Sequence, residues 1–338
     1  MQIKFSNNKL SGAIFLVLFS VALLVLFGAG CATYRPIAKY QNYQQCVVEV
    51  LVDGSLQGSG WYAGPAGEVI TAAHVVKQGN KIEIINYERK RIPYNLLAVD
   101  IGNDVALLMP AEGCRIKNYF AIQDKPPQPF EMIYFAGAAL FRHNLILPGW
   151  VARLETTYEY SPIFDECVAV YHVAADTPPG TSGGCWINRS GKVVGLQSGL
   201  MTLGGAGQGI AFVVPASALQ KILRERKSQS TSSIQCVVEE LWEQSVDVIK
   251  KFPDEARGVY VAKLMKNGVA EKAGLKKGDL IISINERSVQ RRDEFVGILR
   301  KTSKGDILKL SVISQGDNKP KTLEVKVQCL EDIFKLTE

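Results

Sequence analysis

The sequence is poor in the side chains that most often build metal centres. It holds three histidines, and none of its seven cysteines is spaced as C-x-x-C. Structural zinc sites and dithiol redox sites usually carry that spacing, so neither class is indicated. No lysine or arginine tract is interleaved with aromatic residues, although the formal net charge is +6. We therefore expect no metal, no cofactor and no nucleic-acid partner.

The chain also lacks the alternation of strands and helices that is typical of a doubly wound sheet. Short β-branched runs such as CVVEVLV, VITAAHVV and KVVGLQSG instead follow one another from Cys46, with glycine-rich turns between them. This pattern indicates an all-β sandwich or barrel. Pro215 opens the one clear helix of this part, PASALQKILRERK, whose last turn is basic.

A length of 338 residues exceeds what one hydrophobic core usually organises, which favours two domains. The polar run SQSTSS has no apolar side chain to bury and is typical of a flexible linker. The predicted organisation is a leader over 1–30, a tether over 31–45, a first domain over 46–227, the linker over 228–233, a small α+β module over 234–330 and a tail over 331–338.

The leader has the pattern of a targeting segment. Two lysines precede a predominantly apolar stretch, Ile14–Phe27. The end of the leader, LFGAGC, resembles the lipobox of bacterial lipoproteins, which implies cleavage and lipidation at Cys31, although Gly28 stands where that family usually has leucine. An uncleaved anchor is the alternative, because Leu10–Gly30 approaches the ~20 apolar residues that span a bilayer. Both readings tether the body of the protein to a membrane outside the cytoplasm.

Six further cysteines follow Cys31, an even number in a compartment that tolerates disulfides. Cys236 and Cys329 lie near opposite ends of the second domain on strand-like runs, so they are the predicted pair. Free buried thiols are the alternative.

The strongest chemical signal is the sequence G-x-S-G-G at Gly180–Gly184, with Ser182 at its centre. Acyl transfer needs a serine beside backbone amides that point at the carbonyl oxygen where charge develops. Glycines allow the backbone to adopt that shape and the substrate to come close. The motif alone also fits an ordinary small-residue turn.

A serine hydroxyl needs a base, and a base of this kind needs an acid. His74 ends an apolar run in VITAAHVV, whereas His143 lies in a polar context and His172 within a strand-like run. Asp104 opens DVALLM after a turn. The order His74, Asp104, Ser182 is that of chymotrypsin-like chains and not of subtilisin-like or α/β-hydrolase chains.

Five segments, GSGWYAGPAGEVITAAHVV, GNDVALL, PPGTSGG, KVVGLQSG and GIAFVVP, resemble successive signatures of HtrA/Deg-type trypsin-like proteases. The resemblance implies a mainly β fold, a chymotrypsin-like double β-barrel with the triad in the cleft. It makes His74 the general base, Asp104 its orienting acid and Ser182 the nucleophile. It also makes the backbone amides of Gly180 and Ser182 the oxyanion hole.

The chain departs from the family pattern around the predicted nucleophile. Thr181 stands where the family usually has asparagine, and Cys185, which we interpret as structural, stands where it usually has proline. Asp176 has the offset of trypsin's specificity aspartate, which would favour cleavage after lysine or arginine; a solvated loop acid is the alternative. With Gln197 and Ser198, Asp176 makes up the predicted specificity pocket.

The segment 257–289 resembles a bacterial PDZ domain, which implies a groove that binds an extended peptide as an added strand. In that family an apolar-Gly-apolar loop holds the peptide carboxylate. Near 234–237 this chain reads IQCV instead. We therefore expect free C termini to bind poorly.

Together these patterns predict an extracytoplasmic, membrane-tethered serine endopeptidase that cleaves unfolded or exposed protein segments, with peptide capture or regulation by the PDZ domain. The family resemblance implies protein quality control in the bacterial periplasm and, by analogy, a homotrimer. One alternative is a proteolytically silent PDZ scaffold or sensor lipoprotein. Another is a barrel that hydrolyses an ester or processes one dedicated partner.

Overall fold

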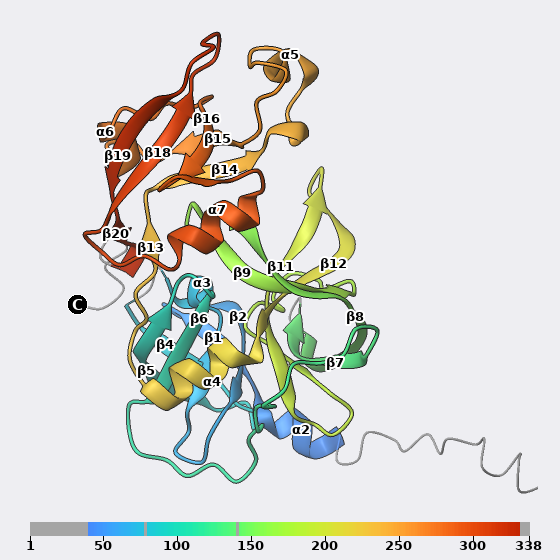
Figure 1. Ribbon diagram of the computed structural model, residues 1–338. Helices are drawn as coiled ribbons and strands as arrows, with labels where there is room; N and C mark the ends of the chain where they lie inside the picture. The colour runs from blue at the N-terminus through green and yellow to red at the C-terminus, as the bar shows by residue number, and fades with distance from the viewer. Residues whose placement is uncertain (1–39, 78–79, 140–141, 332–338) are drawn as a thin grey trace, which may run out of the picture. The chain divides into compact units, whose positions relative to one another are not determined.

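The computed structural model describes residues 40–77, 80–139 and 142–331 (Figure 1). The predicted leader and Cys31 lie outside these residues, as do most of the tether and of the C-terminal tail. Within the described ranges, no helix is long and apolar enough to cross a membrane.

Six short antiparallel strands close into a first barrel, which follows helix α2 (Tyr40–Cys46). A single turn of helix, α3 (Ala73–Val76), leaves the end of its third strand. Around the barrel the strands are ordered β1 (Val47–Val52), β2 (Ser55–Tyr62), β3 (Val69–Thr71), β6 (Val105–Pro110), β5 (Arg91–Asp100) and β4 (Ile82–Ile85).

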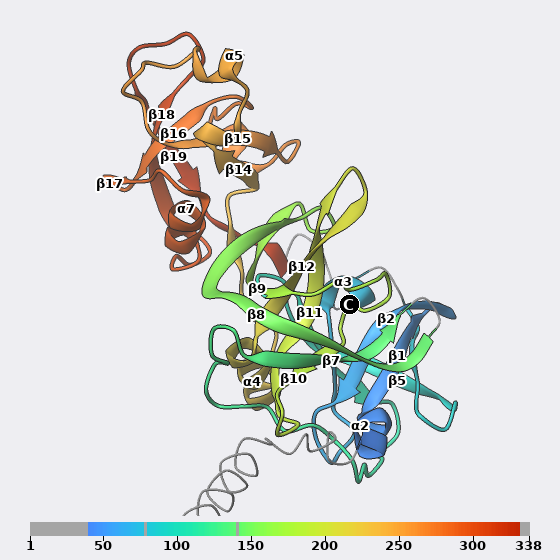
Figure 2. The same ribbon diagram turned by 90° about the vertical axis from the view of Figure 1, so that its right-hand side faces the viewer.

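A second barrel of six strands follows in the chain. Its strand order is β10 (Cys185–Ile187), β11 (Val193–Leu203), β12 (Ala206–Pro215), β9 (Glu166–Ala174), β8 (Arg142–Ser161) and β7 (Met132–Ala139). Helix α4 (Ala216–Glu225) begins directly after Pro215, as predicted, because a proline ring suits the start of a helix. Figure 2 shows α4 beside strands of the second barrel. The predicted double β-barrel is confirmed.

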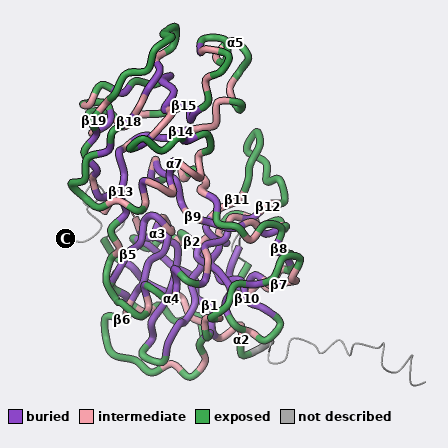
Figure 3. Tube along the Cα trace, viewed as in Figure 1, coloured by how far each residue is buried: buried purple, intermediate pink, exposed green. Residues whose placement is uncertain are grey.

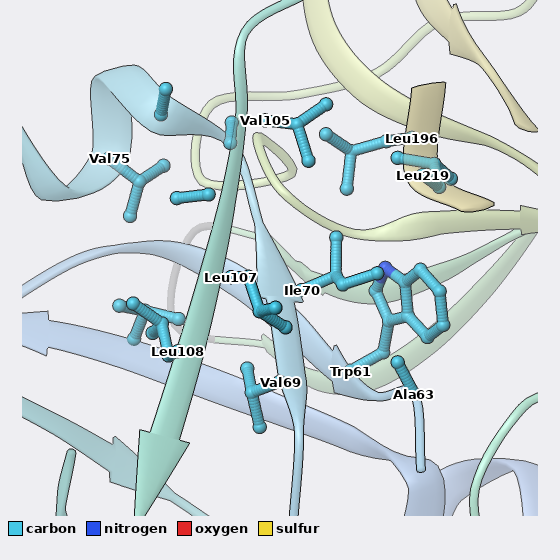
Figure 4. Packing of buried hydrophobic residues seen from close by; sticks show 14 of the residues in the cluster. Trp61, Ala63, Val69, Ile70, Val75, Val105, Leu107, Leu108, Leu196 and Leu219 are labelled. Atoms are coloured by element: carbon cyan, nitrogen blue, oxygen red, sulfur yellow. The ribbon is translucent and has the colours of Figure 1, made fainter. Parts of the chain in front are cut away.

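The first barrel holds its strands through fully buried side chains, several of which Figure 4 shows around Trp61. Ile70 of β3 lies opposite Leu107 of β6, and both side chains have no exposed surface. Every residue of β1 and β3 is buried, a pattern that the purple trace of Figure 3 follows along the strands. Burial on both faces fixes the position of β3, which leads into α3.

The C-terminal module is the predicted small α+β domain. Five strands run in the order β14 (Cys236–Glu240), β15 (Val259–Leu264), β16 (Leu280–Ile284), β18 (Ile307–Ile313) and β19 (Lys321–Lys326), with β17 (Arg287–Ser288) beside β16. The helices are η1 (Leu241–Glu243), α5 (Val246–Ile249), α6 (Val269–Lys272) and α7 (Arg292–Leu299). Phe295 and Leu299 of α7 are buried in the core of the module.

The polar run at 228–233 is more ordered than a flexible linker. Ser232 and Ser233 form strand β13, which pairs with β20 (Gln328–Cys329), and both serines are buried. Hydrogen bonding explains the burial, since the Ser232 hydroxyl donates to the carbonyl of Thr302. Polar side chains can be buried when backbone groups satisfy them.

The predicted pairing of Cys236 with Cys329 is not formed. All six cysteines of the described residues are free, and Cys329 lies opposite Ser232 in the β13–β20 ladder.

Candidate active site

His74 and Asp104, thirty residues apart, meet at one edge of the first barrel. His74 lies on α3, and Asp104 ends a tight turn before β6 with a φ of 52°, a left-handed conformation that aspartate tolerates better than most residues. The His74 amide donates to Asp104 Oδ1 at 2.9 Å, and His74 Nδ1 donates to Asp104 Oδ2 at 2.7 Å. The carboxylate therefore holds both the backbone and the ring of His74. Because Nδ1 carries the proton, Nε2 is left as the proton acceptor.

Ser198 makes a third contact with this carboxylate. Its hydroxyl donates to Asp104 Oδ2 at 2.5 Å, and Asp104 is only 1% exposed. A buried carboxylate is stable only when donors surround it, and here an amide, an imidazole and a hydroxyl do so. The sequence pattern places Ser198 in the specificity pocket, whereas its hydroxyl supports the catalytic acid.

Ser182 lies in the loop between β9 and β10 and is brought to the same place. Its carbonyl accepts a hydrogen bond from the Ser59 amide at 2.8 Å. A Cβ added to Gly58 would lie 2.7 Å from the Ser182 carbonyl oxygen and 2.8 Å from a methyl of Val75, the neighbour of His74. The absence of a side chain at Gly58 thus lets the serine loop approach α3. In this structure the Ser182 hydroxyl donates to the carbonyl of Ser198 at 3.2 Å.

The backbone of the serine loop leaves two amides open. The amides of Thr181, Gly183 and Gly184 donate to the carbonyls of Pro178, Gln197 and Thr181, respectively. Among the residues that the structure describes, the amides of Gly180 and Ser182 donate to no protein acceptor. These are the two amides predicted to form the oxyanion hole. Gly183 has a φ of +86° and abuts the Ser59 carbonyl, so only glycine fits there.

The three side chains predicted to form a specificity pocket lie in three different surroundings. Asp176 is exposed, and its carboxylate faces Gly207 near the β11–β12 turn. Gln197 is buried, accepts from Trp186 Nε1 at 2.9 Å and donates to the carbonyl of Gly199 at 2.6 Å. The Ser198 hydroxyl contacts Asp104.

The other two histidines pair with glutamates away from this site. His172 Nε2 lies 3.0 Å from a carboxylate oxygen of Glu159, and His143 contacts Glu49. Cys185, directly after the serine loop, is fully buried, and burial raises the pKa of its thiol well above the ordinary value. Since the thiolate is the reactive form, Cys185 is not a competing nucleophile.

A cavity of about 470 Å³ opens beside His74. Its polar and apolar lining suits a polypeptide, whose backbone is polar and whose side chains vary. The lining residues are Val52, Asp53, Ser55, Gln57, His74, Val75 and Ile163.

Comparison with known proteins agrees with this geometry. Residues 58–196 match the family of trypsin-like peptidase domains, and residues 233–327 match the family of PDZ domains. The chain is thus similar to a trypsin-like peptidase domain followed by a PDZ domain.

Individual relatives are similar at low identity. A probable periplasmic serine endoprotease, DegP-like, of Hahella chejuensis is 26% identical over 273 residues, which cover 79% of this chain and 56% of the relative. Serine protease HTRA1 of Xenopus laevis is 25% identical over 260 residues, which cover 72% of this chain and 55% of the relative. The chain therefore spans little more than half the length of these relatives.

Solved structures share the fold. The HtrA-type protease AlgW with a decapeptide has a TM-score of 0.61 at 16% identity and is similar over 86% of this chain and 99% of its own. The serine endoprotease from Yersinia pestis has a TM-score of 0.56 at 17% identity and is similar over 86% of this chain and 98% of its own.

The pH dependence of activity tests the His74–Asp104 pair. Burial lowers the pKa of His74, but the charge of Asp104 and its hydrogen bond raise it further, so that the net shift is upward. Only neutral imidazole accepts a proton, so kcat/KM should rise with pH through an apparent pKa above about 6.5, the ordinary histidine value. In Asp104→Asn the lost charge should lower this pKa, and the wrong tautomer should reduce kcat by about 10⁴. Exposed Asp124→Asn is the control, and an unchanged midpoint in Asp104→Asn would contradict the pairing.

Proposed function

We propose that the protein is an extracytoplasmic serine endopeptidase that cleaves unfolded or exposed protein segments through an acyl-enzyme. The observation that carries the proposal is the buried Asp104 carboxylate bonded to His74 Nδ1. The serine loop adds Ser182 and the open amides of Gly180 and Ser182. Each element of acyl-transfer chemistry has a group in place: a nucleophile, a base, an acid that orients the base, and donors for the oxyanion.

The reaction follows from these positions. In the proposed reaction the Ser182 hydroxyl leaves the Ser198 carbonyl, and its proton passes to His74 Nε2 as Oγ attacks the peptide carbonyl carbon. The carbonyl π electrons move to oxygen, where the amides of Gly180 and Ser182 donate to the negative charge. His74 then returns the proton to the leaving amine as the C–N bond breaks. Water repeats the sequence to release the acid and restore Ser182, while Asp104 stabilises the imidazolium in both halves.

One observation favours the alternative of a silent scaffold or sensor. The Ser182 hydroxyl donates to a backbone carbonyl, a contact that would hold the nucleophile away from its base. A single χ1 rotation undoes this contact, and rotamer changes are low in cost compared with a missing catalytic group. We therefore favour the protease.

Active-site labelling separates the two functions. A fluorophosphonate should label the purified protein at Ser182, and the protein should digest casein. Ser182→Ala should lose both activities, with kcat reduced by about 10⁶. Ser190→Ala, which removes a hydroxyl from an exposed turn, should retain both. If the parent protein is folded but is neither labelled nor active, it is a scaffold.

The PDZ domain is proposed to capture extended internal segments and not free C termini. Strand β14 pairs only with β15 among the described strands, so its other edge can accept an added strand. Gln235, in the loop expected to bind a carboxylate, has a φ of 62°. Its amide donates to the Ser233 hydroxyl at 2.8 Å, and its side-chain oxygen accepts from the Val269 amide at 2.7 Å. The Gln235 amide, which lies where a carboxylate would bind, is thus already occupied.

Calorimetry with matched peptides tests this mode of capture. A peptide with an apolar C terminus should bind with the same affinity, within about twofold, whether its end is a free carboxylate or an amide, since the Gln235 amide is already bonded to Ser233 and is not free for the charge. Micromolar binding that amidation abolishes would show instead that the carboxylate site works.

Tethering to a membrane by the leader completes the proposal. Its support is the lysine-flanked apolar stretch ending at Cys31, together with the periplasmic location in the names of the DegP-like relatives. One acyl chain binds membranes only weakly, whereas two or more anchor a protein stably.

Metabolic labelling with an alkyne fatty acid tests the anchor. The parent protein should incorporate the label and sediment with membranes, and mass spectrometry should find an acylated N-terminal Cys31. Cys31→Ala should lose the label, and Cys114→Ala, which changes an exposed cysteine, should keep it. An intact Met1 on membrane-bound protein would instead identify an uncleaved anchor.

A further inference from the structure

Ser59, on β2 of the first barrel, is a buried hydroxyl without a role in the triad. It has no exposed surface, and its Oγ accepts a hydrogen bond from the Ala138 amide at 2.8 Å. Ala138 belongs to β7 of the second barrel. Ser59 therefore joins the two barrels at a point where water cannot replace a lost hydrogen bond.

The remaining polar atoms of Ser59 reach the serine loop. The Ser59 amide donates to the Ser182 carbonyl at 2.8 Å, and the Ser59 hydroxyl lies 3.0 Å from the Gly180 carbonyl oxygen and 3.1 Å from that of Ala138, to either of which it can donate. One residue thus contacts the carbonyls of the same two residues whose amides are open. Because each peptide unit is planar, holding the carbonyls of Gly180 and Ser182 restricts the peptide units between them.

The preceding turn sets the direction of the Gly180 amide. Thr181 donates to the Pro178 carbonyl twice, from its amide at 3.4 Å and from its hydroxyl at 2.8 Å. Proline at the second position keeps φ negative, and Gly180 at the third has a φ of +90°. That combination defines a type II turn, for which proline followed by glycine is the favoured pair. A type I turn would rotate the central peptide, which carries the Gly180 amide, by about half a turn.

We propose that Ser59 and the 178–181 turn are positioning elements that keep the oxyanion hole formed before substrate binds. The proposal rests on the proposed protease function and extends it to groups that never touch the substrate. Ser59 holds the loop from the side of the first barrel, and the turn aims the Gly180 amide. The open amides of Gly180 and Ser182 are what such support produces.

Steady-state kinetics of Ser59→Ala test the proposal. Loss of the hydroxyl should release the Gly180–Thr181 peptide unit, which lies between the two units that carry the open amides. Poorly aimed donors should then lower kcat by about 10- to 100-fold while KM stays within about twofold. A peptide aldehyde, whose adduct places an oxyanion in the hole, should bind more weakly by a similar factor. The affinity for the corresponding peptide amide should not change.

Tyr94→Phe is the matched control. It also removes a buried hydroxyl that donates to a glycine carbonyl, that of Gly67 at 3.0 Å, and this hydroxyl makes no hydrogen bond to the serine loop among the described residues. Both variants should lose comparable thermal stability, and only Ser59→Ala should lose kcat and aldehyde affinity. If the two variants have equal kcat, Ser59 has only a structural role and the proposal is overturned.

Thr181→Val tests the turn independently of Ser59. It still tests the proposal if Ser59→Ala does not fold. It removes the side-chain bond to Pro178 from a buried position with little change in volume. It should lower kcat and aldehyde affinity together, and wild-type values for both would contradict the proposal. A parent protein that neither cleaves casein nor reacts with fluorophosphonate would instead refute the protease function itself.

Discussion

The site depends on one buried negative charge. Asp104 receives hydrogen bonds from the backbone of His74, from its ring and from the Ser198 hydroxyl, and it has almost no contact with water. An isolated carboxylate in such a place would be strongly unfavourable, so its three donors are a condition for folding as well as for chemistry. They come from the end of β3 and from β11, that is, from both barrels. The Asp104 carboxylate therefore holds together the segments that carry His74 and Ser198.

Around this charge the backbone is shaped by residues with little or no side chain. Gly58 lets the serine loop approach α3, and Gly183 fits against the Ser59 carbonyl at a positive φ. Any larger residue at these positions would push apart the segments that carry His74 and Ser182. Close packing of backbone against backbone is what leaves the Gly180 and Ser182 amides free for a ligand.

Local sequence was enough to predict much of this arrangement. The short strands, the helix after Pro215 and the α+β module follow from hydrophobic pattern and turn residues. The HtrA resemblance supplied the double barrel and the candidates His74, Asp104 and Ser182. Contacts across the fold were not predictable in this way. Nothing near Ser198 in the sequence indicates that its hydroxyl would face Asp104, and Ser59 is an ordinary small residue until the barrels place it against the serine loop. The buried serines of β13 were missed because polarity in sequence says nothing about available backbone partners.

The distribution of thiols has a practical consequence for studying this molecule. Of the six cysteines in the described residues, five are buried and Cys114 alone is exposed. Among the described residues, a maleimide dye applied to the folded protein should therefore attach only at Cys114, in the segment after β6, with the serine loop untouched. That selectivity would give a fluorescent reporter for ligand capture without engineering a cysteine-free background.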